Sequence, residues 1–148
     1  ITEMAERLGS QCVVVGVDSR REDGEYVVHK YTGDPDSRRL AGRRTMDWVL
    51  EAQERGAGEI VLNCIDQDGV RKGYDTAQLA EARSRLTIPL VASGGAGSPS
   101  HFLDVFAPLT EGGANVSGAL AASVFHSGQI AVPDLKTFLA AAGVEVRQ

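Results

Sequence analysis

The chain has 148 residues, of which 43% are apolar and 24% charged, and its formal net charge is −5 at pH 7. This is enough chain for one domain with a buried core, and the composition is that of an ordinary globular protein. The negative charge argues against nucleic acid or an anionic membrane as a partner. No apolar run reaches the roughly 18 residues that a membrane-spanning helix needs.

Two further features concern the setting of the chain. Cys12 and Cys64 both lie in apolar runs, which is typical of buried thiols in a reducing compartment, so we expect a cytoplasmic protein. The chain begins at Ile1, inside a helical pattern and without an initiator Met. We therefore interpret it as a piece of a longer protein.

Apolar runs bounded by Gly, Asp or Pro predict strands, and the stretches between them predict helices. The predicted strands cover residues 12–17, 60–65, 90–92 and 118–122. The predicted helices cover residues 42–55, 76–85, 99–106 and 133–142, after a helix at the start of the chain. Residues 24–33 alternate in polarity and predict a short hairpin in the loop after the first strand.

Strict alternation of strands and helices predicts an α/β domain with a parallel sheet covered by helices. An open doubly wound sheet and part of a closed barrel both fit this order. Small residues at the strand ends, with polar residues just beyond them, favour the barrel, because barrel chemistry gathers on loops at the carboxyl ends of the strands. The chain holds four β/α units, which is half of a (βα)8 barrel.

A glycine-rich loop, Ser93-Gly94-Gly95-Ala96-Gly97, joins the third predicted strand to its helix. Glycines at such a turn let backbone N–H groups approach an anion, and the helix that follows adds its unpaired amides. The next strand ends in small residues with a hydroxyl, Ala122 and Ser123, and barrel phosphate sites are built from two such consecutive loops. We therefore predict a phosphate site, with a tight turn that needs positive φ as the alternative.

Acidic residues mark the ends of the first two predicted strands. Asp18 follows the run VVVGV directly, while Asp66 and Asp68 lie in IDQDG, after the second strand. Asp18 is the better candidate for proton transfer, because a carboxylate at a strand tip lies at the mouth of a barrel. The alternative for any of the three is a turn or helix-capping role. A metal site is not expected, because neither His nor Cys lies near them at ligand spacing.

Four long motifs resemble a known family: VVVGVDSRREDGEYVVHKYTG, DWVLEAQERGAGEIVLNCIDQDGVRKGYD, PLVASGGAGSPSHFLDVF and GALAASVFH. They are similar to the second half of the cyclase subunit of imidazole glycerol phosphate synthase, and the resemblance covers essentially the whole chain. It implies a TIM barrel of which this chain is the C-terminal (βα)4 half. The implied reaction uses ammonia to convert a phosphoribulosyl-formimino aminoimidazole carboxamide ribotide to imidazole glycerol phosphate, with no cofactor.

The resemblance also implies roles for particular residues. It makes Asp18 one of two catalytic acid/base aspartates, and it makes Glu59 a charged residue at the bottom of the barrel, where ammonia enters. The remaining matches bind the bisphosphorylated substrate or grip one of its phosphates: Asp66, Asp68, Gly69, Ser93, Gly94, Gly95, Ala122 and Ser123. A glutaminase subunit is the implied partner.

The chain departs from the family pattern in two ways. The other catalytic aspartate and the second phosphate site belong to the first four β/α units, which this chain lacks. The stretch APLTEGGANVSGAL and residues 35–42 look longer than the corresponding family loops. We therefore expect the chain alone to be inactive.

A half-barrel leaves two unpaired sheet edges and one exposed apolar face. We expect a partner to cover them, either the N-terminal half-barrel or a second copy of this chain. Two other hypotheses remain open at this point: a non-catalytic, self-associating phosphate-binding half-barrel, and the sister phosphoribosyl isomerase of the same pathway, which is built on the same barrel.

Overall fold

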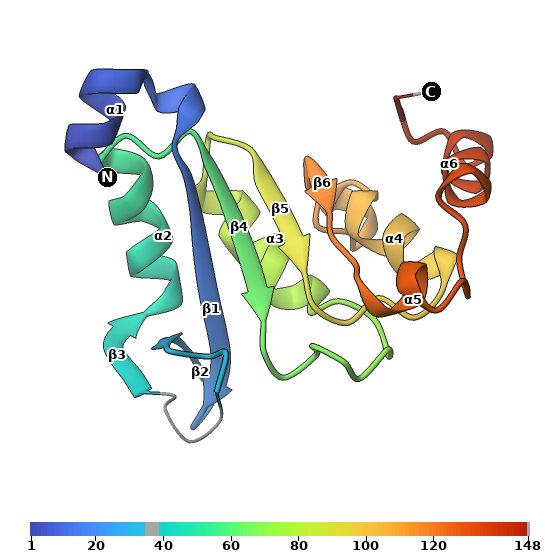
Figure 1. Ribbon diagram of the computed structural model, residues 1–148, viewed down its shortest axis with the longest axis horizontal. Coiled ribbons are helices and arrows are strands. Elements are labelled where there is room, and N and C mark those ends of the chain that lie inside the picture. Colours follow the sequence, from blue (N-terminus) through green and yellow to red (C-terminus); the bar gives the residue numbers. More distant parts are fainter. Residues whose placement is uncertain (35–38, 148) are drawn as a thin grey trace.

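The computed structural model describes residues 1–34 and 39–147, which form one sheet and the helices that cover it (Figure 1). The strands are β1 (Val14–Glu22), β2 (Glu25–Lys30), β3 (Arg39–Arg44), β4 (Glu59–Cys64), β5 (Leu90–Ser93) and β6 (Gly118–Ala119). The α-helices are α1 (Thr2–Leu8), α2 (Thr45–Glu54), α3 (Thr76–Arg85), α4 (Pro99–Phe106), α5 (Ser123–His126) and α6 (Val132–Ala141). None of these described helices is long and apolar enough to cross a membrane.

The six strands form one sheet in the order β3-β2-β1-β4-β5-β6. The pairs β1–β4, β4–β5 and β5–β6 are parallel, and β2 and β3 add an antiparallel extension beside β1. Each parallel pair is joined through a helix, as a right-handed β/α crossover requires. The predicted α/β half-barrel, with four parallel strands and intervening helices, is therefore confirmed.

One face of the parallel strands is buried under helices. Side chains alternate along a strand, and in β4 Ile60, Leu62 and Cys64 are buried while the residues between them are only partly covered. In Figure 1, helix α3 lies behind β4 and β5, helix α4 lies behind and beside β6, and no helix crosses in front of β4 and β5. The fully buried Val49, Leu79 and Phe102 of α2, α3 and α4 belong to the core cluster on this side.

The other face of the sheet is uncovered, and the strand register arranges its side chains in layers. Gly16 is paired with Val61, and Val61 with Val91, in the middle of the strands. Towards the edges of this open face, Val14 is 54% exposed and Leu120 is 50% exposed. Apolar side chains at such exposure are those that a closed barrel would bury in its interior.

The first strand and the hairpin differ from the sequence-based prediction. Strand β1 does not stop at residue 17 but continues to Glu22, because β2 folds back and pairs with it from Asp18 to Glu22. The turn uses Asp23 and Gly24, both with positive φ, as a two-residue hairpin requires. The hairpin therefore joins β1 to β2 rather than lying within residues 24–33.

The sequence-based prediction also missed strand β3. Residues 42–44, assigned to the start of the helix, instead belong to β3, which pairs with β2. Helix α2 begins only at Thr45, a residue that is completely buried. Residues 35–38, part of the stretch that looked long in the sequence, lie outside the described residues.

Two smaller predictions were wrong. Strand β6 covers only Gly118 and Ala119, and the expected residues beyond them lead into the short helix α5. Cys12 is exposed at the end of a 3-10 turn, whereas Cys64 is buried as expected. An apolar neighbourhood in the sequence did not distinguish a residue on a turn from one on the helix-facing side of a strand.

Polar side chains also lie between the sheet and its helices. Ser19 of β1 is hydrogen-bonded to Thr45 of α2 (2.7 Å between hydroxyl oxygens) and accepts a hydrogen bond from the Gln78 amide of α3. The Cys64 thiol of β4 donates to Gln78 Oε1 at 2.9 Å. All four residues are buried, so this chain of hydrogen bonds satisfies polar groups that would otherwise destabilise the core.

The two thiols are expected to differ strongly in reactivity. Burial raises the pKa of the Cys64 thiol far above its ordinary value, so the reactive thiolate is scarce as well as inaccessible. We predict that iodoacetamide labels Cys12 at least about a thousandfold faster than Cys64, since Cys64 reacts only after opening of the fold. Mass spectrometry of the native chain measures both rates, and a Cys12→Ser variant isolates the slow one. In urea the two rates should become similar, and equal rates in the native chain would contradict the packing of β4.

Candidate functional site

A row of polar side chains crosses the open face of the sheet at the carboxyl ends of the strands. Asp18 of β1 is paired with Asn63 of β4, and Asn63 is paired with Ser93 of β5. The three residues occupy equivalent positions in parallel strands, so their side chains point to the same face. In Figure 1 this end of the sheet is at the bottom, where α5 and the loops after β4 and β5 gather.

The Asp18 carboxylate is held by two donors. Asn63 Nδ2 donates to Asp18 Oδ1 at 2.8 Å, and the Thr32 hydroxyl donates to Asp18 Oδ2. Thr32 comes from the segment after β2. A residue of this segment and a residue of the neighbouring strand therefore fix the orientation of the carboxylate together. A proton-transferring group must be positioned in this way before its chemistry matters.

A pocket of about 490 Å³ opens beside this row. It is lined by the loops after β4, β5 and β6, and its walls consist of small or polar residues apart from Leu120. The lining residues are Asn63, Asp68, Gly69, Ser93, Gly94, Gly95, Ala96, Leu120, Ala121, Ala122 and Ser123. The structure therefore brings together seven of the predicted binding residues, namely Asp68, Gly69, Ser93, Gly94, Gly95, Ala122 and Ser123.

The glycine-rich loop is packed directly against the loop that follows β4. A Cβ atom on Gly95 would lie 2.1 Å from the Gly73 carbonyl oxygen, and the φ of Gly95 is +116°. The Gly73 amide donates to the Gly95 carbonyl at 2.9 Å. Gly95 is therefore required both by its conformation and by the close approach of the two backbones.

The same packing leaves amide groups available at the pocket. Within the part of the chain that the structure describes, the amides of Gly94 and Gly95 donate to no backbone carbonyl. Both residues line the pocket. Backbone N–H groups without a backbone acceptor, in a loop that lines a cavity, are the feature of an anion-binding nest, which suits a phosphate group.

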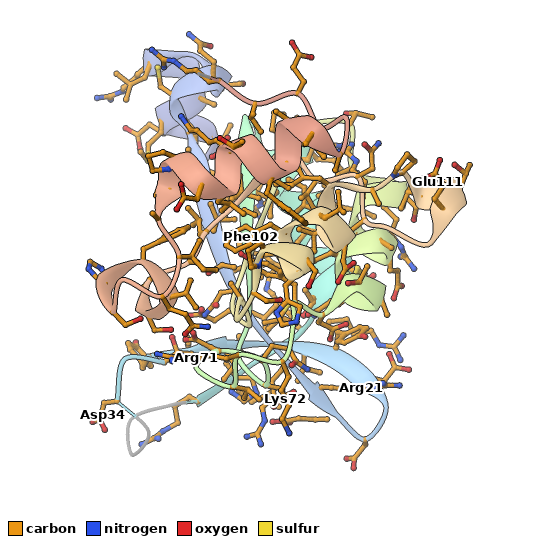
Figure 2. All side chains as sticks on the ribbon, turned by 90° about the vertical axis from the view of Figure 1, so that its right-hand side faces the viewer. Arg21, Asp34, Arg71, Lys72, Phe102 and Glu111 are labelled. Carbon is orange, nitrogen blue, oxygen red and sulfur yellow. The ribbon has the colours of Figure 1, made fainter. Side chains whose placement is uncertain are left out.

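Aromatic side chains support the pocket from below. The Tyr74 ring packs edge-on against Phe102 at 5.7 Å between centroids, and Phe102 lies 5.9 Å from Phe125 of α5. Phe102 is labelled near the centre of Figure 2, beneath the C-terminal helix. The Tyr74 hydroxyl donates to the Leu120 carbonyl at 2.8 Å, and burial raises the pKa of Tyr74 well above its ordinary value. The loops around the pocket thus rest on a rigid, neutral base.

Three predicted residues are not among those that line this pocket: Asp18, which lies in the row beside it, Asp66 and Glu59. The Asp66 carboxylate accepts hydrogen bonds from Arg20 Nε at 3.0 Å and from the Arg21 amide at 2.9 Å, so it ties the loop after β4 to β1. Glu59 is the first residue of β4 and pairs with Val14 at the opposite end of the sheet from Asp18. The roles predicted for Asp66 and Glu59 stay predictions.

Three residues near the pocket were not singled out by the sequence analysis in these roles. Asn63 and Thr32 hold Asp18, and Arg71 reaches Ser123 at the pocket wall. Asn63 had a signal, because it is a polar residue at an alternate position of an apolar strand. Thr32 and Arg71 lie in loops, where the sequence indicates no direction for a side chain. Across residues 1–34 and 39–147, no group of three or more His, Cys, Asp or Glu is arranged to hold a metal ion.

The parallel strands, the covering helices and the polar pocket at the carboxyl ends define a β/α half-barrel, and in barrels of this type the functional sites lie at that end. The model of the family described as histidine biosynthesis protein matches residues 1–131. The chain belongs to this family.

Curated relatives carry the name imidazole glycerol phosphate synthase subunit HisF. The one from Stenotrophomonas maltophilia is 57% identical over 99% of this chain and 55% of its own length. The one from Xanthomonas euvesicatoria pv. vesicatoria is 59% identical with the same coverage, and so is the one from Xanthomonas oryzae pv. oryzae. The chain therefore spans about half the length of the curated relatives it matches.

The contact between the glycine loop and the loop after β4 can be tested by adding one methyl group. Gly95→Ala forces a Cβ against the Gly73 carbonyl, and we predict a loss of at least about 2 kcal/mol in the free energy of unfolding. Gly112→Ala is the matched control, because Gly112 has φ +80° but open space around it, and it should cost about 1 kcal/mol. Urea unfolding followed by circular dichroism measures both. Equal losses would show that the two backbones are not in close contact.

Proposed function

We propose that this chain is the C-terminal half of the cyclase of imidazole glycerol phosphate synthase. In the proposed reaction, ammonia converts a phosphoribulosyl-formimino aminoimidazole carboxamide ribotide to imidazole glycerol phosphate, with release of the aminoimidazole carboxamide ribotide and water. The observation that carries the proposal is the Asp18 carboxylate, held by two donors on the same end of the sheet as a glycine-lined pocket. The family and the HisF relatives support the choice of reaction.

Asp18 serves as an acid/base residue in this proposal. Its two oxygens are oriented by Asn63 and Thr32, so the carboxylate faces the substrate in one position rather than rotating freely. A second aspartate would come from the N-terminal half of the barrel. Two groups are needed because the ring closure both removes a proton and delivers one.

The pocket beside Asp18 binds one phosphate of the substrate. Its volume of about 490 Å³ exceeds that of a phosphate group, so it also accommodates neighbouring atoms of the sugar. Asp68, Gly69 and Ser123 are among the residues that line this pocket. The second phosphate would bind to the missing half, which is why one half holds the substrate at one end only.

Ammonia would enter from the opposite end of the barrel, near Glu59. Asn63 is four positions after Glu59, which corresponds to about 13 Å along β4. The layer between these two ends contains Gly16 and Gly118 opposite Val61 and Val91. Because these two glycines have no side chain, the layer favours a passage for ammonia along the barrel axis. A glutaminase subunit at the Glu59 end would supply the ammonia, and the complete enzyme would work in the cytoplasm.

The sister phosphoribosyl isomerase is the alternative enzyme on the same barrel. The relatives named HisF favour the cyclase. Turnover of the isomerase substrate, and not of the cyclase substrate, by the complete protein would reverse this assignment.

Asp18 can be tested in the reassembled barrel. We predict that neither half alone catalyses ammonia-dependent cyclisation, that the mixture does, and that Asp18→Asn lowers kcat of the mixture by about 10³-fold because the acid/base group is lost. Asp104→Asn on the exposed side of α4 is the matched control and should leave kcat unchanged. Release of imidazole glycerol phosphate measures the rate. Full activity of this chain alone would contradict the need for the missing half.

The open face can be tested through association. Without the missing half, we predict that this chain forms dimers, because Val14 and Leu120 would otherwise remain in water. Leu120→Glu should weaken the dimer at least tenfold by placing a charge on the covered face, at a cost of about 1.4 kcal/mol or more. Val132→Glu, on a helix away from this face and 45% exposed, is the control. A monomer in sedimentation experiments that binds no dye for apolar surfaces would be evidence against self-association.

A further inference from the structure

Arg71 is a cation at the rim of the pocket, and its backbone is fixed in place. A Cβ atom on Gly97 would lie 2.1 Å from the Arg71 carbonyl oxygen, so the glycine loop packs directly on this residue. Arg71 also has φ +60°, a conformation that non-glycine residues rarely adopt. Figure 2 labels Arg71 and its neighbour Lys72 on the loop that follows β4.

The Arg71 side chain is directed towards the pocket wall by two contacts. Arg71 Nε donates to Ser123 Oγ at 3.2 Å, and Nη1 donates to Gln129 Oε1 at 3.4 Å. Gln129 is held in turn, because its Nε2 donates to the Gly97 carbonyl at 2.7 Å. The guanidinium therefore connects the loop after β4 with the segment that begins at α5.

The contact with Ser123 has a chemical consequence. Since Ser123 Oγ accepts a hydrogen bond from Arg71, its own hydroxyl hydrogen is free to be donated to another acceptor. Ser123 lines the pocket, so that acceptor would be the ligand. A hydroxyl that accepts from a guanidinium is polarised and donates more strongly to an anion.

The contact between Arg71 and Ser123 matters because of the charges carried by the residues that line the pocket. Asp68 contributes a carboxylate, whereas none of the described residues that line the pocket is Lys or Arg. An anion bound beside Asp68 requires a positive charge to balance the repulsion. Arg71 is the cation joined by a hydrogen bond to the pocket wall. Lys72 makes no hydrogen bond or ion pair to the rest of the described chain.

We propose that Arg71 supplies the positive charge for phosphate binding in this pocket and acts through the Ser123 hydroxyl. The inference rests on the proposed function, because it adds a positioning residue to the same phosphate site. The ligand class is a phosphate monoester or inorganic phosphate in its dianionic form. Arg71 carries no part of the acid/base chemistry assigned to Asp18.

The test measures binding of inorganic phosphate to the full 148-residue chain by calorimetry at several salt concentrations. Arg71→Gln should weaken binding about tenfold and flatten its dependence on salt, because one screened charge is removed. Lys72→Gln is the matched control, with the same change of charge on the neighbouring residue, and should change the affinity less than about twofold. Arg71→Lys should recover part of the affinity and the salt dependence.

A second variant separates charge from loop support. Gln129→Ala removes the contact that braces Arg71 but leaves the bond to Ser123, so it should have a smaller effect than Arg71→Gln and keep the salt dependence. Equal losses in both variants, with unchanged salt dependence, would overturn the proposal in favour of a purely structural role.

Different outcomes distinguish the role of Arg71 from the existence of the phosphate pocket. If the native chain binds phosphate and Arg71→Gln binds it equally well, the role of Arg71 is wrong while the phosphate pocket stands. If the native chain binds no phosphate, the pocket assignment fails and the role of Arg71 falls with it. Urea unfolding of each variant verifies that a weaker affinity does not come from a partly unfolded chain.

Discussion

The alternation of side chains along parallel strands is the constraint on which the rest of this structure depends. In β4 every second residue is buried under the helices, and this fixes Glu59, Val61 and Asn63 on the opposite face. The parallel register then aligns Asn63 with Asp18 and Ser93 at one end of the sheet. A shift of one residue would bury these polar groups and expose the core, so packing on one face determines the chemistry of the other.

The pocket depends on a second constraint, the direct contact between backbones of consecutive loops. Gly95 and Gly97 approach the carbonyls of Gly73 and Arg71 more closely than any side chain would permit. This contact does two things at once, because it holds the glycine loop at the pocket and it fixes the residue whose side chain reaches Ser123. Binding and positioning thus share one packing interaction, supported by the aromatic side chains beneath it.

The uncovered face explains why half of a barrel is an incomplete unit. The same alternation that buries Leu62 leaves Leu120 and Val14 in contact with water. A closed barrel covers such residues with the remaining strands and supplies the opposite wall of the site. The exposed surface is also the one that carries Asp18, so covering it would change the stability of the sheet and the surroundings of this carboxylate together.

The sequence by itself determined the order of strands and helices, the glycine loop and the strand-end position of Asp18, because apolar periodicity and glycine patterns are local. It could not predict β3 or the full length of β1, since these depend on pairing with β2. Only the tertiary structure decided that Asn63 and Thr32 hold Asp18, that Asp66 is bonded to Arg20, and that Arg71 reaches Ser123. These contacts join residues far apart in the chain, and long-range packing sets their geometry.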